Sequence, residues 1–592
     1  MGDPPVRALH PGRDLPPEVR EVLAPHVAQR TLPGLDAIGA EIAKKRDEAK
    51  TAREASGIEN SWKDAEEAYE GIDDANRHEF GDSRWSKSMA LNGPISTNDK
   101  PPGSNHRSTA FLRLTARYVD AGSAKLGEIL LPADDKAFSF TETPVPDLIE
   151  ASDDESQVVH DQLGPLTRPL KPGEAPPPGV QPGPNVRVPL TVKDLALEKI
   201  EAAREKAKAA ETRIYDWMVE CQYRGEARKI IFDAARLGVG VLKGPVPKVK
   251  KLMASRRTAR GIGVEIKEKV APVAKWVDPW DFFPDGACGE NIHDGDYVFE
   301  RDRMSERQVR GLKKEPGYIA SQIDKVLEEG PNKVNLDGSS RARGQVITKD
   351  RYEVWYFYGV IDRDAMEAIN QAAGKEERYE TEEVYAIVTL INDSVVRAVI
   401  NPLDSGEFPY NSMPWQRRSG YWAGIGVGEQ MKMPQRMVNA SLRALLNNAG
   451  ISGGVQLINA ECAIVPGDVD WVITGNKVWF WTNNNGSTKN VNEAMAAIVI
   501  PNVTEQMLTI VQTAERFAEE TTSIPLITQG QSGATTPDTF GAAQLQNNNA
   551  NQLLRAIGYS FDDFITEPFI RQMYEYLLLD PDVPEEEKGD WQ

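Results

Sequence analysis

Residues 424–450 read GIGVGEQMKMPQRMVNASLRALLNNAG, a glycine-rich entry followed by an amphipathic helix. Apolar and polar positions recur at the spacing of one helical turn, so the two kinds of side chain lie on opposite faces. The apolar face consists of Val438, Leu442, Leu445, Leu446 and Ala449, and the polar face consists of Gln435, Asn439 and Arg443. This pattern predicts a long helix that packs along one side and presents polar groups to water on the other.

The residues after this helix predict a small β-like insert and then a second helix. Strand-like pieces occur within 451–500, and helical spacing returns from Val503 to Thr522, with Asn502 and Glu505 in the pattern of a capping box. The second helix ends with two carboxylates, Glu519 and Glu520. Carboxylates oppose the macrodipole at a helix C-terminus, which indicates either a functional surface or a merely solvated end.

A loop follows the second helix. Residues 523–539 are rich in Thr, Gly, Ser and Gln and carry almost no charge, so we expect a mobile segment with little affinity for a phosphate backbone. Thr536 and Pro537 are typical of a helix start and predict a third helix after the loop.

The composition indicates a large globular subunit with an acidic balance. Its 592 residues correspond to about three or four domains at roughly 150 residues each. The chain carries 89 acidic and 69 basic side chains, a formal net charge of -20. This charge has the wrong sign for a protein that grips nucleic acid by neutralising phosphates, so we expect any contact with DNA to be weak or repulsive.

Cysteine, metal and membrane signals are weak. Cys221, Cys288 and Cys462 lie far apart, which favours a reducing compartment over a disulfide framework. Only Cys288 and His293 are near one another, and a structural zinc site needs four such ligands, so we expect no metal or other cofactor. No apolar run reaches the ~18 residues of a membrane span, and no signal peptide is evident. We therefore expect a soluble protein that stays where it is made.

The N-terminal part divides by composition. Residues 1–35 are proline-rich and predict a loosely ordered arm, and residues 143–189 predict an exposed, proline-rich excursion. Apolar spacing predicts one or two helices within 111–130. A long helix should begin near Thr191, with Asp194 in the position of a capping-box partner.

Residues 239–400 favour strands. The clearest strands are 352–358, 384–391 and 395–400, and Asn392-Asp393 predicts a hairpin turn between the last two. A helix near 362–373 should interrupt the sheet.

Three motifs have competing interpretations, and the first is the glycine run Gly424, Gly426 and Gly428. Glycines before a helix let phosphates approach backbone N–H groups, which suggests nucleotide binding. The spacing differs from the dinucleotide fingerprint, and a Trp/Arg/Ser/Tyr loop rather than a strand precedes it. The sequence therefore favours a non-nucleotide role.

The second motif is the acidic stretch from Asp278 to Asp285, with His293, Asp294 and Asp296 beyond it. Carboxylates and an imidazole could form a catalytic cluster. Asp-Pro and Pro-Asp-Gly are also ordinary turn sequences, and no nucleophile or complete ligand set accompanies them, so turns are favoured.

The third motif is a basic run without acidic residues, and two interpretations remain open for it. It could bind phosphates or an acidic partner, or it could be a solvated hairpin, which is slightly favoured. Its residues are Lys248, Lys250, Lys251, Arg256, Arg257 and Arg260, preceded by Lys243.

Taken in order, these features resemble the portal proteins of tailed bacteriophages, of the short-tailed phage type. The resemblance extends over about residues 108–579, and the order and spacing of the motifs carry it. The motifs are Val277-Asp278-Pro279 with Asp281-Phe282-Phe283 and Asp296-Tyr297-Val298, Phe408-Pro409-Tyr410 with Gly424, Gly426, Gly428, Gln435 and Asn439, and the helices that flank Ile524-Pro525-Leu526.

The resemblance implies an elongated α+β subunit that assembles into a ring of about twelve copies at the unique capsid vertex. Through this ring the genome would be packaged and ejected. The implied parts are a wing at 36–402, an entry loop and first stem helix at 403–450, a clip at 451–500, a second stem helix at 501–522, a tunnel loop at 523–540, and a tunnel-side helix with a short crown at 541–592.

The resemblance also implies roles for individual residues. The stem helices would turn their polar sides, including Gln435, Asn439 and Arg443, toward the DNA, and the clip strands would pair with neighbouring subunits. Channel and tunnel residues would be Glu519, Glu520, Thr528, Gln529, Gln531 and Thr535, and motor-docking residues of the clip would be Asn483, Asn484, Asn485 and Gly486.

The implied partners are double-stranded DNA, a large terminase that supplies the packaging energy, a head-to-tail adaptor, and the major capsid and scaffolding proteins. The subunit would act in the virion after assembly in the host cytoplasm, and it would not be an enzyme. One alternative is a capsid or tail structural adaptor without a DNA channel. Another is a nucleotide- or metal-dependent hydrolase, which the six scattered histidines and the missing GxxxxGK[ST] loop disfavour.

Overall fold

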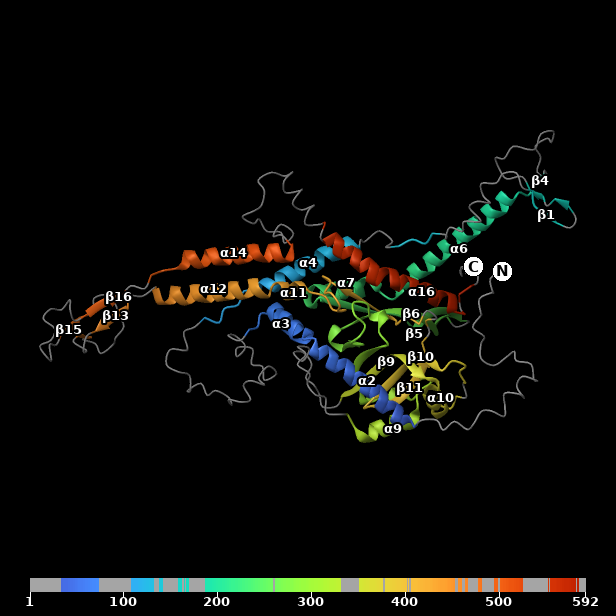
Figure 1. Ribbon diagram of the computed structural model, residues 1–592, viewed down its shortest axis with the longest axis horizontal. Helices are drawn as coiled ribbons and strands as arrows, with labels where there is room; N and C mark the ends of the chain where they lie inside the picture. The colour runs from blue at the N-terminus through green and yellow to red at the C-terminus, as the bar shows by residue number, and fades with distance from the viewer. Residues whose placement is uncertain are drawn as a thin grey trace.

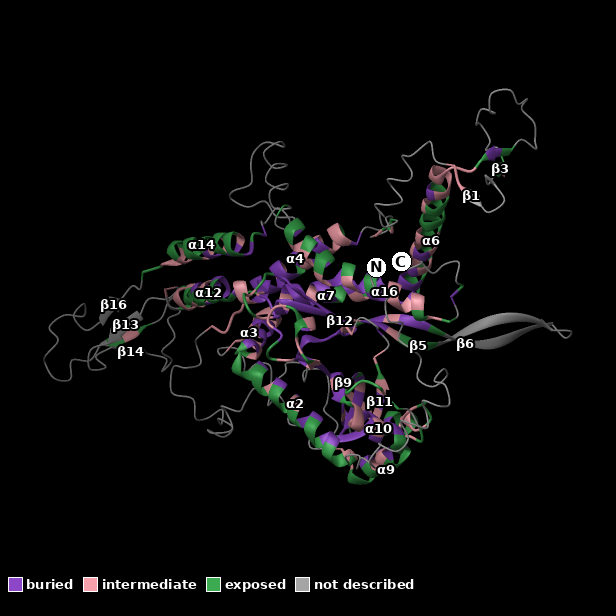
Figure 2. Cartoon of the chain, turned by 45° about the vertical axis from the view of Figure 1, so that its right-hand side comes forward, coloured by how far each residue is buried: buried purple, intermediate pink, exposed green. Residues whose placement is uncertain are grey.

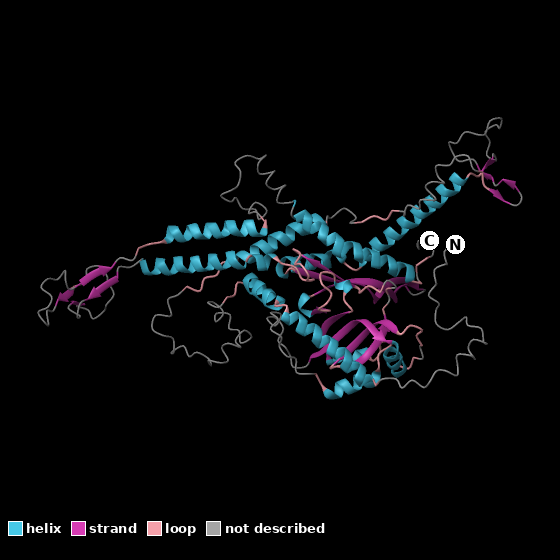
Figure 3. Ribbon diagram, viewed as in Figure 1, coloured by secondary structure: helices cyan, strands magenta, loops and turns pink. Residues whose placement is uncertain are grey.

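A computed structural model of the chain combines long helices with antiparallel sheets, so the α+β class predicted from the sequence is confirmed (Figures 1 and 3). The structure describes residues 34–73, 108–131, 138–141, 158–161, 164–165, 167–169, 187–258, 261–331, 351–375, 378–401, 403, 406–452, 456–459, 464–466, 478–481, 495–498, 501–524, 552, 554–581 and 583–584.

The described helices differ widely in length. They are α2 (Leu35–Ala55), α3 (Ile58–Glu70), α4 (Leu114–Leu130), α6 (Val192–Glu220), α7 (Tyr223–Leu237), α8 (Glu306–Leu312), α9 (Ala320–Glu329), α10 (Arg363–Ala372), α11 (Val427–Gln430), α12 (Lys432–Ser452), α14 (Thr504–Thr522) and α16 (Glu567–Leu579), which follows a π-helical turn, Asp562–Thr566.

The described strands form two larger sheets and several two-stranded pairs. They are β1 (His160–Asp161), β2 (Gly164–Pro165), β3 (Thr167–Pro169), β4 (Arg187–Pro189), β5 (Val239–Thr258), β6 (Gly261–Val277), β7 (Phe282–Pro284), β8 (Tyr297–Ser305), β9 (Arg351–Asp362), β10 (Glu383–Ile391), β11 (Ser394–Ile400), β12 (Tyr410–Pro414), β13 (Gln456–Asn459), β14 (Ile464–Pro466), β15 (Trp479–Trp481) and β16 (Met495–Ile498).

The five-stranded sheet has the order β11-β10-β9-β8-β7 and is covered on both faces. Successive side chains of β9 point to opposite faces. Trp355 and Phe357 meet α2 and α10, whereas Tyr352 and Val354 meet α8 and α9. The predicted strands and the turn are confirmed, since Asn392 and Asp393 have φ angles of 51° and 65°, as a two-residue hairpin turn between right-twisted strands requires.

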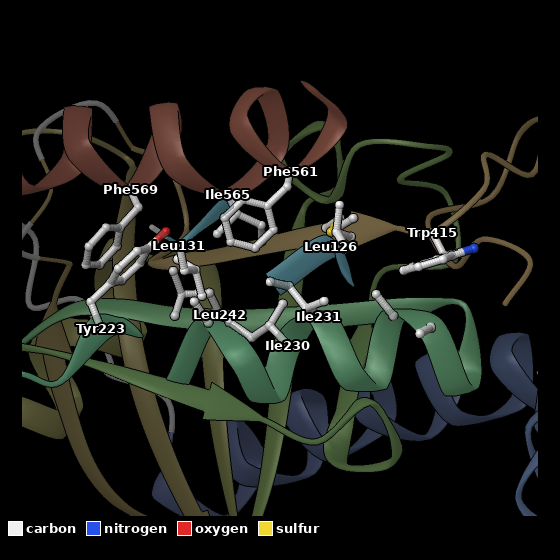
Figure 4. Close-up of a cluster of buried hydrophobic side chains, with 14 of the residues drawn as sticks. Leu126, Leu131, Tyr223, Ile230, Ile231, Leu242, Trp415, Phe561, Ile565 and Phe569 are labelled. Carbon is white, nitrogen blue, oxygen red and sulfur yellow. The ribbon is translucent and has the colours of Figure 1, made fainter. Parts of the chain in front are cut away.

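The main core lies between the helices α4, α6, α7 and α16 and the sheet β12-β5-β6 (Figures 1 and 4). Ile230 and Ile231 of α7 and Leu126 of α4 are fully buried there. Tyr223 stacks on Phe569 of α16, with the ring centroids 5.1 Å apart. This packing joins the C-terminal helix to elements that come more than 300 residues earlier.

Two helices and four short strands protrude from this body. α12 runs outward, the strands β13 to β16 lie at the tip, and α14 returns beside α12 (Figure 1). Exposed residues dominate α14, and the outer part of α12 is mostly of intermediate burial (Figure 2). The α12–α14 pair is named the prong, and its exposure contrasts with the buried body.

The structure bears on several local predictions. α6 begins after Thr191, and the capping box is present, because the N–H of Asp194 donates to Thr191 Oγ1 at 3.2 Å and the N–H of Thr191 donates to Asp194 Oδ2 at 3.2 Å. The helix predicted near 362–373 is α10. The basic run lies in a hairpin, because β5 pairs with β6 through Thr258 and Gly261.

One local prediction is wrong. No capping box starts α14; instead Asn502 Oδ1 accepts the N–H of Thr504 at 3.0 Å, because the helix begins one residue later than its sequence pattern indicates. The strands at the tip of the prong pair within the chain, β13 with β16 and β14 with β15. Their pairing with neighbouring subunits stays a prediction.

Some predictions fall outside the described residues. The arm was predicted at 1–35, and residues 1–33 of it lie outside the described residues. α2 begins at Leu35. Of the excursion 143–189, the described pieces form the pairs β1–β2 and β3–β4.

Candidate functional site

The polar row on α12 is the first candidate site, and the structure places most of it inside the protein. Gln435 and Asn439 are only 3% and 4% exposed. Gln435 Oε1 accepts the N–H of Thr115 at 2.9 Å, and Gln435 Nε2 donates to Leu112 O at 2.5 Å. Asn439 Oδ1 accepts the N–H of Leu112 at 3.3 Å. The two amides therefore bind the backbone of Leu112 and of Thr115 in the first turn of α4. The segment before α4, residues 108–113, is named the strap.

Arg443 and Asn447 continue this row along the helix. Arg443 Nε donates to Ala110 O at 3.0 Å, and Arg443 also pairs with the carboxylate of Asp73 at 2.7 Å. Asn447 Oδ1 accepts the N–H of Ser108 at 2.7 Å. Arg443 and Asn447 together therefore bind Asp73 and Ser108, the two described residues that border the segment 74–107.

The prediction that this row faces water and DNA is wrong for Gln435 and Asn439. The row Gln435, Asn439, Arg443 and Asn447, named the ladder, repeats every fourth residue and so forms a continuous row inclined to the helix axis. Backbone amide and carbonyl groups of the strap need partners once they are buried, and the ladder supplies them. The ladder therefore binds the main chain of the strap and makes no contact that depends on the side chains of the strap.

The next residue, Asn448, fixes the start of the second prong helix. Asn448 Nδ2 donates to Pro501 O at 3.1 Å, and Asn448 Oδ1 accepts the N–H of Val503 at 3.0 Å. Adjacent asparagines on α12 therefore hold two different chain segments, the strap and the entry to α14. Sequence spacing identifies the ladder, but it gives no sign of Asn448 or of the segments that both bind.

The glycine run is packed against the end of α7. A Cβ on Gly426 would lie 2.5 Å from Gly238 N, and one on Gly428 would lie 2.4 Å from Arg236 O. A Cβ on Gly424 would lie 2.3 Å from Gln416 O. Close backbone contact accounts for all three glycines without a bound nucleotide.

The acidic stretch after β6 forms turns, as the sequence favoured. Asp278 Oδ1 accepts the N–H of Trp280 at 2.9 Å and starts a short 3-10 helix, Pro279–Asp281. Asp281 pairs with Arg301 at 3.1 Å. His293 Nε2 lies 3.3 Å from Asn411 Oδ1. Among the described residues, no group of His, Cys, Asp and Glu could hold a metal ion.

Two carboxylates end α14, as predicted, and they differ in their surroundings. Glu520 is exposed and pairs with Arg516 at 3.0 Å, and Glu519 is half-buried. The helix terminates at Ser523, which has a left-handed φ of 55°. Ile524 is buried and, like Trp415, lies against Gly122 of α4. Ile524 therefore anchors the chain just before residues 525–550.

The other candidate residues lie wholly or partly outside the described structure. Lys248 is exposed on β5. Four further basic residues also belong to β5, and the structure describes only their backbone: Lys250, Lys251, Arg256 and Arg257. Outside the described residues are Arg260, Asn483, Asn484, Asn485, Gly486, Thr528, Gln529, Gln531 and Thr535.

Two buried charge clusters were not predicted from the sequence. Burial raises the pKa of Glu66 to about 7, although Arg236 and a hydrogen bond from Trp280 Nε1 oppose the shift. Lys243 pairs with buried Glu300, which also accepts the Tyr410 hydroxyl at 2.5 Å. Burial alone would raise the pKa of Glu300, but the attraction of Lys243 lowers it.

A cavity of about 460 Å³ opens between α3 and α12 beside the ladder. Its walls carry both signs of charge, and two of its pairs are Lys432 with Asp64 at 2.7 Å and Arg443 with Asp73. These internal pairs leave no organised set of catalytic carboxylates there. None of the described helices is both long enough and apolar enough to span a membrane.

The described residues define an elongated α+β structural subunit, in which the polar residues singled out by sequence hold other parts of the chain. A protein-family model described as the phage SU10 portal protein matches residues 247–586. Because this match covers more than half of the chain, the chain belongs to this family of phage portal proteins. Such proteins are structural head-to-tail connectors of bacteriophages. A search of curated proteins found no match.

Proposed function

We propose that this chain is one subunit of a ring of about twelve copies at the capsid vertex, through which double-stranded DNA is packaged and ejected. The observation that carries the proposal is the prong, a helix pair that stands away from the body and leaves most of α14 exposed in a single chain. In the ring, α12 is the first stem helix, residues 451–500 are the clip and α14 is the second stem helix. Residues 523–540 form the tunnel loop.

The remaining parts follow from this assignment. Residues 36–402 form the wing, residues 403–450 supply the entry loop and the first stem helix, and residues 541–592 supply the tunnel-side helix and a short crown. About twelve helices, each about 10 Å wide, enclose a lumen of about 28 Å when laid side by side, and a duplex about 20 Å wide passes through it. The net charge of -20 on each copy keeps phosphates from docking on the wall.

The clip supplies the docking surface for a terminase motor, and the opposite part of the ring contacts the tail adaptor and the capsid. Val478 and Phe480 near the tip support a protein contact there, because they are large, apolar and exposed. Deleting residues 483–487 should preserve rings but weaken motor docking. If this variant bound the terminase motor as well as the unaltered ring does, the assignment of residues 451–500 as the clip would be wrong.

Electron microscopy of the purified chain tests the proposed ring. We expect closed rings with a central hole. Assemblies without a hole would support the alternative of a structural adaptor, and an intact ring with ATPase activity would support the hydrolase alternative.

A further inference from the structure

The outer edge of α14 is a stripe of Thr509, Thr513, Arg516 and Glu520. These residues are three or four apart, so they line up along the helix, and all four are exposed. The opposite stripe of the same helix is buried and contains Ala514, Ala518 and Thr522. The outer edge therefore points away from the rest of the protomer.

Hydrogen bonds within the helix use both hydroxyl donors of this edge and the Nε–H of its arginine. Thr509 Oγ1 donates to Glu505 O at 3.0 Å, and Thr513 Oγ1 donates to Thr509 O at 2.8 Å. Arg516 Nε donates to Glu520 Oε1 at 3.0 Å. The edge from Thr509 to Glu520 therefore presents oxygen acceptors and a guanidinium that is already paired, and its net charge is zero.

The other sides of the prong are suited to protein contacts. The ladder side of α12 is covered by the strap. Met433 on α12 and Ile510 and Phe517 on α14 are 65%, 37% and 40% exposed, and such apolar groups do not suit the wall of a water-filled channel. Among the described surfaces of the prong, the outer edge of α14 combines exposure with a polar surface whose hydroxyl donors and cation already have partners within the helix.

We propose, on the basis of the proposed ring, that the outer edge of α14 faces the passing duplex and that Glu520 serves as the internal counter-ion of Arg516. Phosphate oxygens bind strongly to an unpaired guanidinium, and a ring would repeat that contact in every copy. Glu520 prevents this binding by occupying Arg516. In this assignment Glu520 acts by pairing with Arg516. Direct repulsion of the DNA phosphates by Glu520 is not required.

Three variants separate these two roles of Glu520. Glu520→Gln removes the carboxylate and releases Arg516. The double variant Arg516→Gln with Glu520→Gln removes both charges. Glu505→Gln removes an exposed carboxylate from the same helix and changes the net charge as much as Glu520→Gln does, so it is the matched control.

The measurement is retention of a linear duplex by purified rings between about 50 and 200 mM salt, with ring closure checked by electron microscopy. We expect Glu520→Gln to retain the duplex about tenfold more tightly at low salt, with a steeper salt dependence. The double variant and Glu505→Gln should behave like the unaltered ring.

The inference is overturned if rings form but Glu520→Gln has no effect. It is equally overturned if the double variant or Glu505→Gln binds as tightly as Glu520→Gln, because general loss of repulsion would then explain the result. Failure of the unaltered chain to form rings would instead reject the proposed function.

Discussion

At the scale of single residues, Glu66 is a buried carboxylate whose negative charge is only partly compensated by its neighbours. Its carboxylate lies among Asp233, Asp278 and the single cation Arg236, whose nearest nitrogen is 3.7 Å away. Glu66 Oε2 is buried without a hydrogen-bond partner among the described residues. Burial without full compensation favours the protonated form and explains the raised pKa of about 7.

The shift of Glu66 predicts how stability depends on pH. The pKa rises on folding from 4.5 to about 7, so the favourable contribution of Glu66 is complete below about pH 4.5 and is lost as the pH rises through about 7. Glu66→Gln keeps a neutral side chain at every pH. Denaturation should show that this variant matches the unaltered protein at pH 4 and exceeds its free energy of unfolding by about 3 kcal/mol at pH 8. A Glu41→Gln control, at an exposed position of α2, should show no such gain.

Gly426 is limited by sterics and not by charge. An added Cβ would meet Gly238 N at 2.5 Å and Ala235 O at 3.0 Å, and backbone atoms cannot rotate away from it. Gly426→Ala should therefore lower the free energy of unfolding by about 2 to 3 kcal/mol. Gly450→Ala has open space around the new methyl group and should raise it by about 0.5 to 1 kcal/mol. Equal effects in a denaturation titration would contradict the packing role of Gly426.

At the scale of elements, the ladder connects α12 to a strap more than 300 positions earlier in the chain. Replacing Gln435 and Asn439 together by Ala leaves the buried N–H group of Thr115 and the partly buried N–H group of Leu112 without their acceptors. The expected loss is about 2 to 4 kcal/mol of stability, because an unpaired buried polar group costs more than a hydrogen bond contributes.

Hydrogen exchange measures this effect locally. The amides of Leu112 and Thr115 should lose protection in the double variant, whereas Arg436→Ala, at an exposed position on the same helix, should leave them protected. Unchanged protection in the double variant would show that the strap is held by other contacts.

The elements that sequence predicted well are those whose apolar spacing matches their burial. The strands β9, β10 and β11 and their Asn392-Asp393 turn are examples, since their side chains pack on the covering helices and the turn requires residues that tolerate positive φ. α2 has a weaker signal, because charged residues interrupt the apolar row of Ile38, Ile42 and Ala49 on its buried face. Its inner face carries Lys50 and Arg53, which lie over Trp355 and Phe283 at 4.5 and 3.7 Å from the ring centroids. Charged residues on a buried face defeat an argument from hydrophobic periodicity.

The candidate site was only partly predictable for a related reason. Helical spacing identified Gln435, Asn439 and Arg443 as one polar face, but a polar face is the same in sequence whether it meets water or buried backbone. The strap that covers this face has no sequence feature complementary to it, because the ladder binds main-chain groups. The same argument applies to Glu520. Its i,i+4 spacing from Arg516 predicts their pairing, but only the structure shows that Glu520 is exposed.

At the scale of the whole molecule, apolar exposure is uneven. The body buries its large side chains in the clusters around α7 and the five-stranded sheet. The prong instead exposes Met433, Leu446, Leu508, Ile510 and Phe517. These residues gain nothing in the isolated chain, so their burial must come from association with other copies if the proposed ring forms.

This asymmetry separates folding from assembly in one variant. Phe517→Glu alters a side chain that is 40% exposed in the monomer, so the melting temperature of the variant should stay within a few degrees of that of the unaltered chain. Burying the new carboxylate between copies is unfavourable, so the variant should need a higher protein concentration to assemble. Light scattering and sedimentation should show no rings even at about ten times the concentration at which the unaltered protein forms them. Thr513→Glu, one turn away on the outer edge, places the same charge where the proposed ring has its lumen, so its assembly should be unchanged. If Phe517→Glu assembled normally and Thr513→Glu did not, the two sides of α14 would have to exchange roles, with the outer edge forming the contact between copies.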